Sequence, residues 1–358
     1  MQLTEPFEIS SGVAYDRRVI LIALYCDGVT GWGECVAGEH PDYSYETIQT
    51  AWPILTELIL PKVSGAEAAT ASELMEPVRW IRGHRMAKAA VEMAANDLEA
   101  KLRGERLSDH LGGVRDAVRV GVSIGLQPTD DELHRKVGDF VEQGYSRVKI
   151  KIKPGRDIEM LAGVRERFPD VALMADANSA YTLADGPRLK ALDALDLMMI
   201  EQPLAHDDYL DHARLQQTLD TPICLDESIR SVRDAALAIE IGAGRIINIK
   251  PGRVGGHGES IRLHDLCASH GVPVWHGGML ESGIGRAHNV HLASLPNFSL
   301  PGDVAASHRY YAPDLIEPPI EVRPDGTIPV PTGPGLGVTI VGDRVSRATE
   351  RAVMLRAG

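Results

Sequence analysis

The sequence predicts an α/β protein whose larger part is a barrel of parallel strands that alternate with helices. Four short apolar segments each end in a polar residue, and these residues, Asp176, Glu201, Asp226 and Lys250, follow one another at intervals of 25, 25 and 24 residues. Compact strand–helix units of a (β/α)8 barrel repeat at roughly this interval, and such barrels build their active sites at the carboxyl ends of the strands. From about residue 118 onward, strand-like and helix-like patterns alternate, which also indicates a parallel sheet.

The region before residue 116 has a different pattern, typical of a small α+β domain. Residues 19–25 are apolar and predict a buried strand, and Asp27-Gly28 supplies the turn to a partner strand over residues 30–34. Residues 1–18 are polar and contain Phe7 and a turn at Ser10-Ser11-Gly12. Helical patterns follow the hairpin over residues 45–60, 66–80 and 86–102.

The barrel pattern begins with a strand over residues 120–124 and a helix over 129–143, whose first turn is acidic, as the helix dipole favours. Residues 148–152 alternate branched apolar residues with Lys149 and Lys151, so a strand here places both lysines on one face. Taken alone, this alternation is also typical of an edge strand whose lysines lie in water. The remaining strands complete a set of eight and are expected over residues 173–178, 197–203, 222–227, 245–250, 273–278 and 299–303.

Composition and charge weigh against several other classes of protein. The chain has 358 residues, of which 44% are hydrophobic and 24% charged, as in an ordinary soluble globular protein. Its formal net charge of −13, with no basic cluster, argues against nucleic acid as a partner. The four cysteines show no paired spacing, and no signal pattern or bilayer-length apolar run is found, so we expect a cytoplasmic protein that does not bind a membrane.

The carboxylates at the strand ends predict a divalent metal site. Asp176, Glu201 and Asp226 offer hard oxygen ligands with no cysteine or histidine among them, which suits Mg²⁺, or alternatively Mn²⁺, rather than Zn²⁺. The alternative is that the three side chains are unrelated helix N-caps, since loops after barrel strands favour Asp.

Two lysines enter the expected barrel from opposite sides. Lys151 and Lys250 lie on strands that are four apart in the barrel, which makes them the candidate catalytic base and acid. Lys149, on the same face as Lys151, is a third catalytic candidate.

Two further polar residues are candidates to surround and orient the metal ligands and the lysines. Asn178 follows Asp176 by two residues and shares its face of the strand. Glu227 is adjacent to Asp226, and we expect it to orient Lys250 or to pair with it.

The motifs on successive strands resemble the enolase superfamily, in its muconate-lactonizing-enzyme subgroup: they read Lys-x-Lys, Asp-x-Asn, Glu-Gln-Pro, Asp-Glu and Lys-Pro-Gly. The segment from Trp275 to Asp303 resembles o-succinylbenzoate synthases and the N-succinylamino acid (N-acylamino acid) racemases of the same sequence family. The resemblance implies a modified (β/α)7β TIM-type barrel over residues 116–310. It also implies an α+β capping domain formed by residues 1–115, against which the C-terminal segment 311–358 packs, and a homo-oligomer.

A glycine-rich loop before a predicted helix is the candidate substrate-binding segment. Backbone N–H groups at such a helix start can hold an anion, and the resemblance implies a succinyl carboxylate of the substrate. The alternative is a flexible surface loop. The candidate residues are Ser123 on the first barrel strand and Gly278, Met279, Leu280, Glu281 and Ser282.

The chain departs from the family pattern at its start. Relatives usually have another strand ahead of the loop that corresponds to Pro6-Phe7, and here the chain begins almost at that loop. In the family this loop closes over the substrate, so the departure bears on substrate preference rather than on the chemistry.

The resemblance implies a Mg²⁺-dependent enzyme that removes a proton alpha to a carboxylate. Two reactions stay open: the dehydration catalysed by o-succinylbenzoate synthase, a lyase of menaquinone biosynthesis, and the racemisation of N-succinylamino acids. In the dehydration Lys151 moves the protons while Lys250 stabilises the anion, whereas in the racemisation both lysines act as acid and base. The alternatives are a cycloisomerase or dipeptide epimerase of the same subgroup, a hydrolase built on the same barrel, and a catalytically inactive barrel. The shortage of metal-ligating histidines weighs against the hydrolase, and the full set of lysines and carboxylates weighs against inactivity.

Overall fold

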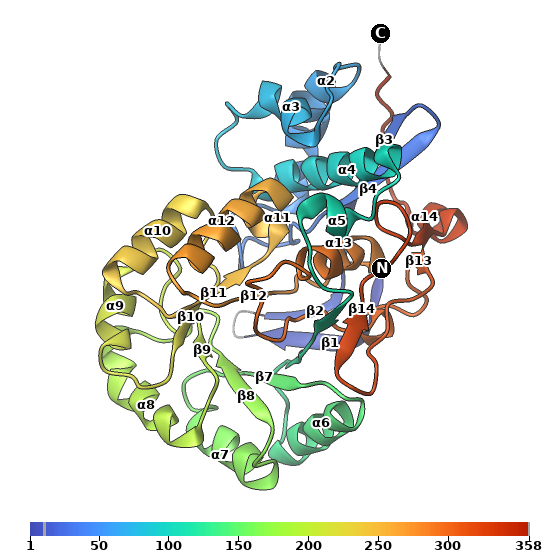
Figure 1. The fold of residues 1–358 in the computed structure, drawn as a ribbon. Coiled ribbons are helices and arrows are strands. Elements are labelled where there is room, and N and C mark those ends of the chain that lie inside the picture. The colour runs from blue at the N-terminus through green and yellow to red at the C-terminus, as the bar shows by residue number, and fades with distance from the viewer. Residues whose placement is uncertain (10–11, 357–358) are drawn as a thin grey trace.

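The computed structural model describes residues 1–9 and 12–356, and its centre is a curled sheet of seven parallel strands ringed by helices (Figure 1). The strands are ordered as they occur in the sequence, each one hydrogen-bonded to the next. This confirms the predicted α/β barrel fold class. The strands are β6 (Val122–Ile124), β7 (Arg147–Lys151), β8 (Ala172–Asp176), β9 (Ile200–Glu201), β10 (Ile223–Leu225), β11 (Ile246–Ile249) and β12 (Val274–His276).

Helices between the strands cover the outside of the sheet (Figure 1). The first of them begins where the sequence predicts, because the Thr129 side chain accepts a hydrogen bond from the backbone N–H of Glu132. It buries Leu133, Val137 and Phe140. The outer helices are α6 (Asp130–Glu142), α7 (Ile158–Arg167), α8 (Gly186–Lys190), α9 (Leu210–Gln216), α10 (Val232–Ile241), α11 (Pro251–Val254), α12 (His257–Ser269) and α13 (Gly283–Leu292).

Beneath the strand-end residues, the barrel interior holds a small buried apolar cluster. Met174, Met199 and Cys224 each lie two residues before a polar strand end, and Ile246 is the register partner of Cys224. Trp275 joins them because its Nε1 donates to the Cys224 sulfur at 3.2 Å. The cluster consists of Met174, Met199, Cys224, Ile246 and Trp275.

The prediction of an eighth strand over residues 299–303 is wrong. The segment closes the gap between β12 and β6 with single bridges instead, one between Val274 and Phe298 and one between Val120 and Gly302. Pro301 has no N–H to donate, so a regular ladder cannot continue through it.

The capping region is built on a hairpin of β3 (Ile20–Cys26) and β4 (Val29–Cys35), packed against the long helix α4 (Arg85–Arg103). Asp27 and Gly28 adopt the predicted left-handed conformations at the turn, with φ of 50° and 82°. A Cβ on Gly33 would lie 2.0 Å from the Ala90 carbonyl oxygen, so glycine allows the close approach of the helix. The first predicted helix is continuous over residues 48–63 but is π-helical in its middle: α1 (Ile48–Pro53), η1 (Ile54–Ile59) and α2 (Leu60–Val63). The second is shorter than predicted and consists of α3 (Ala71–Met75) and η2 (Glu76–Val78).

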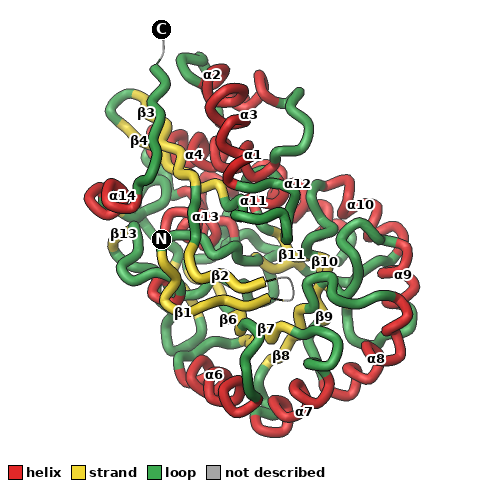
Figure 2. The backbone as a smooth tube through the Cα atoms, turned by 180° about the vertical axis from the view of Figure 1, so that it is seen from behind, coloured by secondary structure: helices red, strands yellow, loops and turns green. Residues whose placement is uncertain are grey.

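The loop expected around Pro6 and Phe7 is not found in residues 2–9 and 12–16. They form an antiparallel pair, β1 (Gln2–Ile9) and β2 (Gly12–Asp16), so Pro6 and Phe7 lie in a strand rather than a loop (Figure 2). The predicted turn at residues 10–12 lies partly outside the described residues. The Glu8 carbonyl accepts a hydrogen bond from Leu126 N–H at 3.1 Å, so the hairpin packs beside the carboxyl end of β6.

The C-terminal segment returns to both earlier regions. Strand β14 (Thr327–Pro329) pairs with β5 (Ala117–Arg119), and the Leu336 N–H donates to Asp97 of α4 at 2.8 Å. The remaining short elements are α5 (Leu107–Leu111), η3 (Leu183–Asp185), η4 (Ala191–Leu195), η5 (Ser307–Arg309), β13 (Ile316–Glu317), β15 (Thr339–Ile340) and α14 (Gly342–Ala348). The division at residues 115 and 310 stays a prediction. Within the described ranges, the helices are all too short or too polar to cross a bilayer.

Candidate active site

The predicted strand-end residues all lie at the carboxyl ends of their strands and point into the barrel. Asp176 and Glu201 are the last residues of β8 and β9, and they are register partners. Asp226 and Lys250 follow directly after β10 and β11. All four side chains are buried, as are Lys149 and Lys151, which excludes the alternative of lysines in water.

Each carboxylate is paired with a protein cation in this structure. The Nζ of Lys151 lies 2.6 Å from Asp176 Oδ2. The Nζ of Lys149 lies 2.9 Å from Glu201 Oε2, and the Nζ of Lys250 lies 2.8 Å from Asp226 Oδ2. The carboxylates point toward these amines. Among residues 1–9 and 12–356, no group of three acidic, histidine or cysteine side chains is arranged to hold a metal ion.

The donor set nevertheless fits a divalent cation. Burial, followed by the charge of Asp176, raises the pKa of Glu201 to about 8, although Lys149 acts in the opposite direction. Burial is the main cause of this shift and the charge of Asp176 adds to it, so a cation bound among the carboxylates would stabilise the ionised form of Glu201. Within the described chain, two buried oxygen atoms beside them, Asn248 Oδ1 and Glu227 Oε2, have no hydrogen-bond partner. Carboxylate and amide oxygens are the ligands that Mg²⁺ accepts.

The capping region contributes a side chain that no sequence pattern had indicated. Tyr43, in the loop between β4 and α1, donates its hydroxyl hydrogen to Asp226 Oδ1 at 3.0 Å. The same hydroxyl accepts a hydrogen bond from Lys250 Nζ at 3.0 Å, and the Lys250 amine lies 4.6 Å from the centre of the tyrosine ring. Burial is the largest single effect and lowers the pKa of Lys250, but the charges of Asp226, Tyr43 and Glu201 together outweigh it and hold the pKa above its ordinary value. Lys250 is therefore an ammonium ion here.

A second residue that was not predicted, Arg253 of α11, pairs with the same carboxylate. Its Nη1 contacts Asp226 Oδ1, and its Nε donates to the Ile229 carbonyl at 2.7 Å. The spacing of three residues after Lys250 is the only signal in the sequence that places Arg253 near the site.

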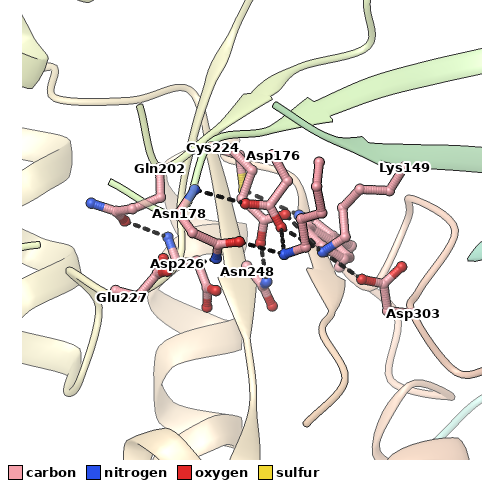
Figure 3. A network of polar contacts seen from close by, with 12 residues as sticks. Lys149, Asp176, Asn178, Gln202, Cys224, Asp226, Glu227, Asn248 and Asp303 are labelled. Carbon is pink, nitrogen blue, oxygen red and sulfur yellow. Dashed lines mark hydrogen bonds and ion pairs between the residues drawn. The ribbon is translucent and has the colours of Figure 1, made fainter. Parts of the chain in front are cut away.

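The two predicted outer residues contact each other rather than acting separately. Asn178 Oδ1 accepts a hydrogen bond from Lys151 Nζ at 2.6 Å, and Asn178 Nδ2 donates to Glu227 Oε1 at 2.9 Å (Figure 3). The expectation that Glu227 pairs with Lys250 is wrong, because the Lys250 amine is hydrogen-bonded to Asp226 and Tyr43 instead. Asn178 thus links the Lys151 amine to Glu227 on the far side of the site.

The predicted anion site at the start of α13 needs correction. The N–H groups of Ser282 and Gly285 donate to Glu34 of β4, at 3.0 and 3.1 Å, and the N–H of Gly283 donates to Asp314 at 2.8 Å. Two protein carboxylates therefore occupy the positions expected for a substrate anion. The loop residues Gly278, Met279, Leu280 and Glu281, which precede the helix, keep their predicted role as a proposal, as does Ser123, whose buried Oγ finds no hydrogen-bond partner among the described residues.

A buried group of charges lies beside the strand-end carboxylates. Asp303, in the segment that closes the barrel, contacts Lys149 Nζ at 2.6 Å through one oxygen and Arg147 Nη1 at 2.6 Å through the other. Burial alone would raise the pKa of Asp303, but the charges of Arg147 and Lys149 outweigh it and lower the pKa to about 2. Trp275 lies beside both cations, with its ring centre 5.1 Å from the Arg147 guanidinium and 5.0 Å from the Lys149 amine.

Comparisons with known proteins agree with the sequence resemblance. The model of the mandelate racemase / muconate lactonizing enzyme N-terminal domain matches residues 1–112, and the enolase C-terminal domain-like model matches residues 132–344. An o-succinylbenzoate synthase of Geobacillus kaustophilus is 54% identical over 353 residues, which cover 98% of this chain and 94% of the relative.

Two further comparisons extend the match. An N-succinylamino acid racemase of Thermus thermophilus is 52% identical, over 96% of this chain and 93% of the relative. A solved structure of an enolase superfamily member from Listeria innocua aligns with a TM-score of 0.94 at 44% identity, over 98% of this chain and 94% of that one.

Proposed function

The chain belongs to the mandelate racemase and muconate lactonizing enzyme family of the enolase superfamily, and from this premise we propose that it removes the proton alpha to a substrate carboxylate. Enzymes of this superfamily depend on a metal ion. The proposed activity is that of an o-succinylbenzoate synthase, an N-succinylamino acid racemase, or both, as in the relatives at 54% and 52% identity. A dipeptide epimerase has less support, because the L-Ala-D/L-Glu epimerase of Bacillus subtilis is 26% identical.

The observation that carries the proposal is the placement of two lysines on opposite sides of the carboxylates. Lys151 ends β7 and contacts Asp176, whereas Lys250 follows β11 and contacts Asp226. Three strands separate β7 from β11 in the sheet. A substrate carbon held between these lysines would therefore meet one amine on each face.

The carboxylates and the lysines of the site have different roles in the proposed reaction. We assign Asp176, Glu201 and Asp226 to hold Mg²⁺, with Mn²⁺ as the alternative. When bound, this cation supplies positive charge that stabilises the negative charge developing on the substrate carboxylate. Lys151 takes the alpha proton as general base, once it has lost its own. Lys250 stands on the other face as an ammonium ion.

The two candidate reactions diverge once the alpha proton has been removed. In racemisation Lys250 gives a proton to the face opposite the one that Lys151 deprotonated, and the roles exchange in the reverse direction. In dehydration the electron pair left by the alpha proton forms a carbon–carbon double bond, and hydroxide leaves the neighbouring carbon. The Lys151 ammonium protonates that hydroxide, so that water departs, while the charge of Lys250 stabilises the anion.

Substrate binding and assembly complete the proposal. We assign Ser123 and the loop from Gly278 to Glu281 to the part of the substrate that bears the succinyl group, with Ser282 holding the loop in place through Glu34. We also expect a homo-oligomer, and solution scattering at working concentration tests this by its mass.

The deciding experiment assays the purified protein, with Mg²⁺ and with excess chelator, on two substrates. One is the hydroxylated cyclohexadiene carboxylate precursor of o-succinylbenzoate, and the other is a panel of single enantiomers of N-succinyl amino acids. Turnover of either that is lost on chelation supports the proposal. Turnover of neither, by protein whose circular dichroism shows it to be folded, would contradict it.

A further inference from the structure

The Lys149 amine has three carboxylate partners, and they differ in their availability once a metal is bound. Its Nζ lies 2.6 Å from Asp303 Oδ2, 2.9 Å from Glu201 Oε2 and 3.1 Å from Asp176 Oδ2. Glu201 and Asp176 are proposed metal ligands, and Asp303 is not. A divalent cation on Glu201 and Asp176 would take their charge and repel the ammonium, so Asp303 is the partner that would remain.

Asp303 is itself held in a fixed position. Its backbone N–H donates to the His276 carbonyl of β12 at 2.7 Å. Its second carboxylate oxygen pairs with Arg147, whose Nη2 donates to the Pro301 carbonyl at 2.9 Å. Figure 3 shows Asp303 joined to the Lys149 amine on the side away from Asp226. These contacts hold the Asp303 carboxylate in place, so it does not move toward the proposed metal ligands. The Lys149 amine therefore stays beside Asp303.

Burial strengthens the interactions among these three charged side chains. The side chains of Arg147, Lys149 and Asp303 are 1%, 4% and 8% exposed, so water does not screen their charges. A buried ammonium that loses its counter-charge turns to the nearest alternatives, which for Lys149 are Glu201 and Asp176.

We propose that Asp303 is a positioning residue for metal binding: anchored by Arg147, it holds the Lys149 ammonium aside so that Lys149 does not compete with the divalent cation for Asp176 and Glu201. The inference rests on the proposed function, because it assumes that these carboxylates hold the metal. Without Asp303, Lys149 becomes an internal competitor of the cation.

The test is a double-mutant cycle read by metal binding rather than by turnover. Mn²⁺ dissociation constants are measured by electron paramagnetic resonance for the wild type, Asp303→Asn, Lys149→Met and the double variant. We expect Asp303→Asn to raise the dissociation constant by at least about tenfold, within the range found for residues that support metal ligands. In the Lys149→Met background the same substitution is expected to change it by less than about threefold, because the competitor is gone.

Asp97→Asn is the matched control. Asp97 is buried and pairs with Lys101 at 2.6 Å in α4, away from the metal carboxylates, so its substitution removes the same charge without freeing Lys149. We expect an unchanged Mn²⁺ affinity for it.

The outcomes separate the inference from the proposed function. An equal effect of Asp303→Asn in both backgrounds, or no effect in either, overturns the inference and leaves the metal site standing. Failure of the folded wild type to bind Mn²⁺ at all overturns the proposed metal site. A crystal structure of the Mn²⁺-loaded wild type gives a check that needs no variant: Lys149 Nζ should stay within hydrogen-bonding distance of Asp303, and an amine found elsewhere overturns the inference.

Discussion

Tyr43 of the capping region donates a hydrogen bond to Asp226 of the barrel at 3.0 Å, across 183 residues of sequence. The same hydroxyl accepts from the Lys250 amine, so one side chain of the cap contacts both a proposed metal ligand and a proposed acid. The cap therefore completes the site as well as covering it. This relationship and the contacts around it lead to five predictions.

Substitution of Tyr43 by Phe should lower kcat about tenfold with the fold intact. It removes the hydroxyl that fixes Lys250, and a hydrogen bond to a charged group contributes about 1.5 kcal/mol. Steady-state kinetics measure the effect. Tyr181→Phe is the control, because that hydroxyl also donates to a buried carboxylate, Asp157 at 2.8 Å. Equal losses in the two variants would show that the Tyr43 hydroxyl acts through stability alone.

Activity should require a divalent ion, and Asp226→Asn should reduce it by about a thousandfold or more, since one charged metal ligand is lost. The variant should fold but melt at a lower temperature than the wild type, because Lys250 and Arg253 keep their buried charges without their partner. Assays with and without chelator, together with thermal denaturation, measure both effects. Full turnover after exhaustive chelation would remove the metal from the mechanism.

Isotope exchange should distinguish the roles of Lys151 and Lys250. If the protein racemises N-succinyl amino acids, Lys151→Ala should stop exchange of the alpha proton from one enantiomer, and Lys250→Ala from the other, because one amine faces each side of the carbon. Proton NMR in D₂O follows both enantiomers. Exchange at the wild-type rate from both enantiomers in either variant would point to another base, with Lys149 as the first one to test.

Gly277→Ala should lower kcat about a hundredfold. A Cβ at this position would lie 2.3 Å from Asn248 Oδ1 and 2.4 Å from Lys250 Cε, so the lysine must move, and displacement of a catalytic group by about 1 Å costs roughly that factor. Gly342→Ala is the control, since no described atom outside its neighbours lies within 4 Å of the added carbon. Activity close to that of the wild type in Gly277→Ala would show that the Lys250 side chain adjusts without loss.

Ionisation of Glu34 should make stability fall as pH rises. Burial raises its pKa to about 7 from 4.5, although Ser282 donates hydrogen bonds to it. Between these values the folded state binds more protons than the unfolded state, so stability is lost as pH rises through this window and levels off above it. The loss is on the order of 3 kcal/mol.

The measurement for Glu34 is denaturant unfolding of the wild type and Glu34→Gln at pH 5, 6, 7 and 8, with chelator present. Glutamine does not titrate, so the free energy of unfolding of the wild type relative to the variant should decrease by about 3 kcal/mol from pH 5 to pH 8. Other titrating groups cancel in the comparison. A difference that stays constant across this range would show that Glu34 is ionised throughout.

The barrel and the strand-end residues could be predicted because their signals are local. Alternation along residues 148–152 puts Lys149 and Lys151 on one face, and the even spacing of Asp176, Glu201 and Asp226 marks successive strand ends. Where local signals were weak, the predictions failed. Residues 2–9 and 12–16, expected to include a loop at Pro6-Phe7, form an antiparallel strand pair that packs beside β6, and the expected eighth strand is replaced by single bridges next to Pro301.

The sequence by itself therefore determined which side chains enter the barrel and at what level, because strand periodicity and strand order fix both. Only the tertiary structure decided which partners those side chains have. Tyr43 meets Asp226 across 183 residues, Arg147 meets Asp303 across 156, and Glu34 meets Ser282 across 248. Each contact joins segments whose own patterns specify a strand, a loop or a helix start, but not the surface against which it packs. That choice is made by burial of the whole cap against the whole barrel, which no local pattern encodes.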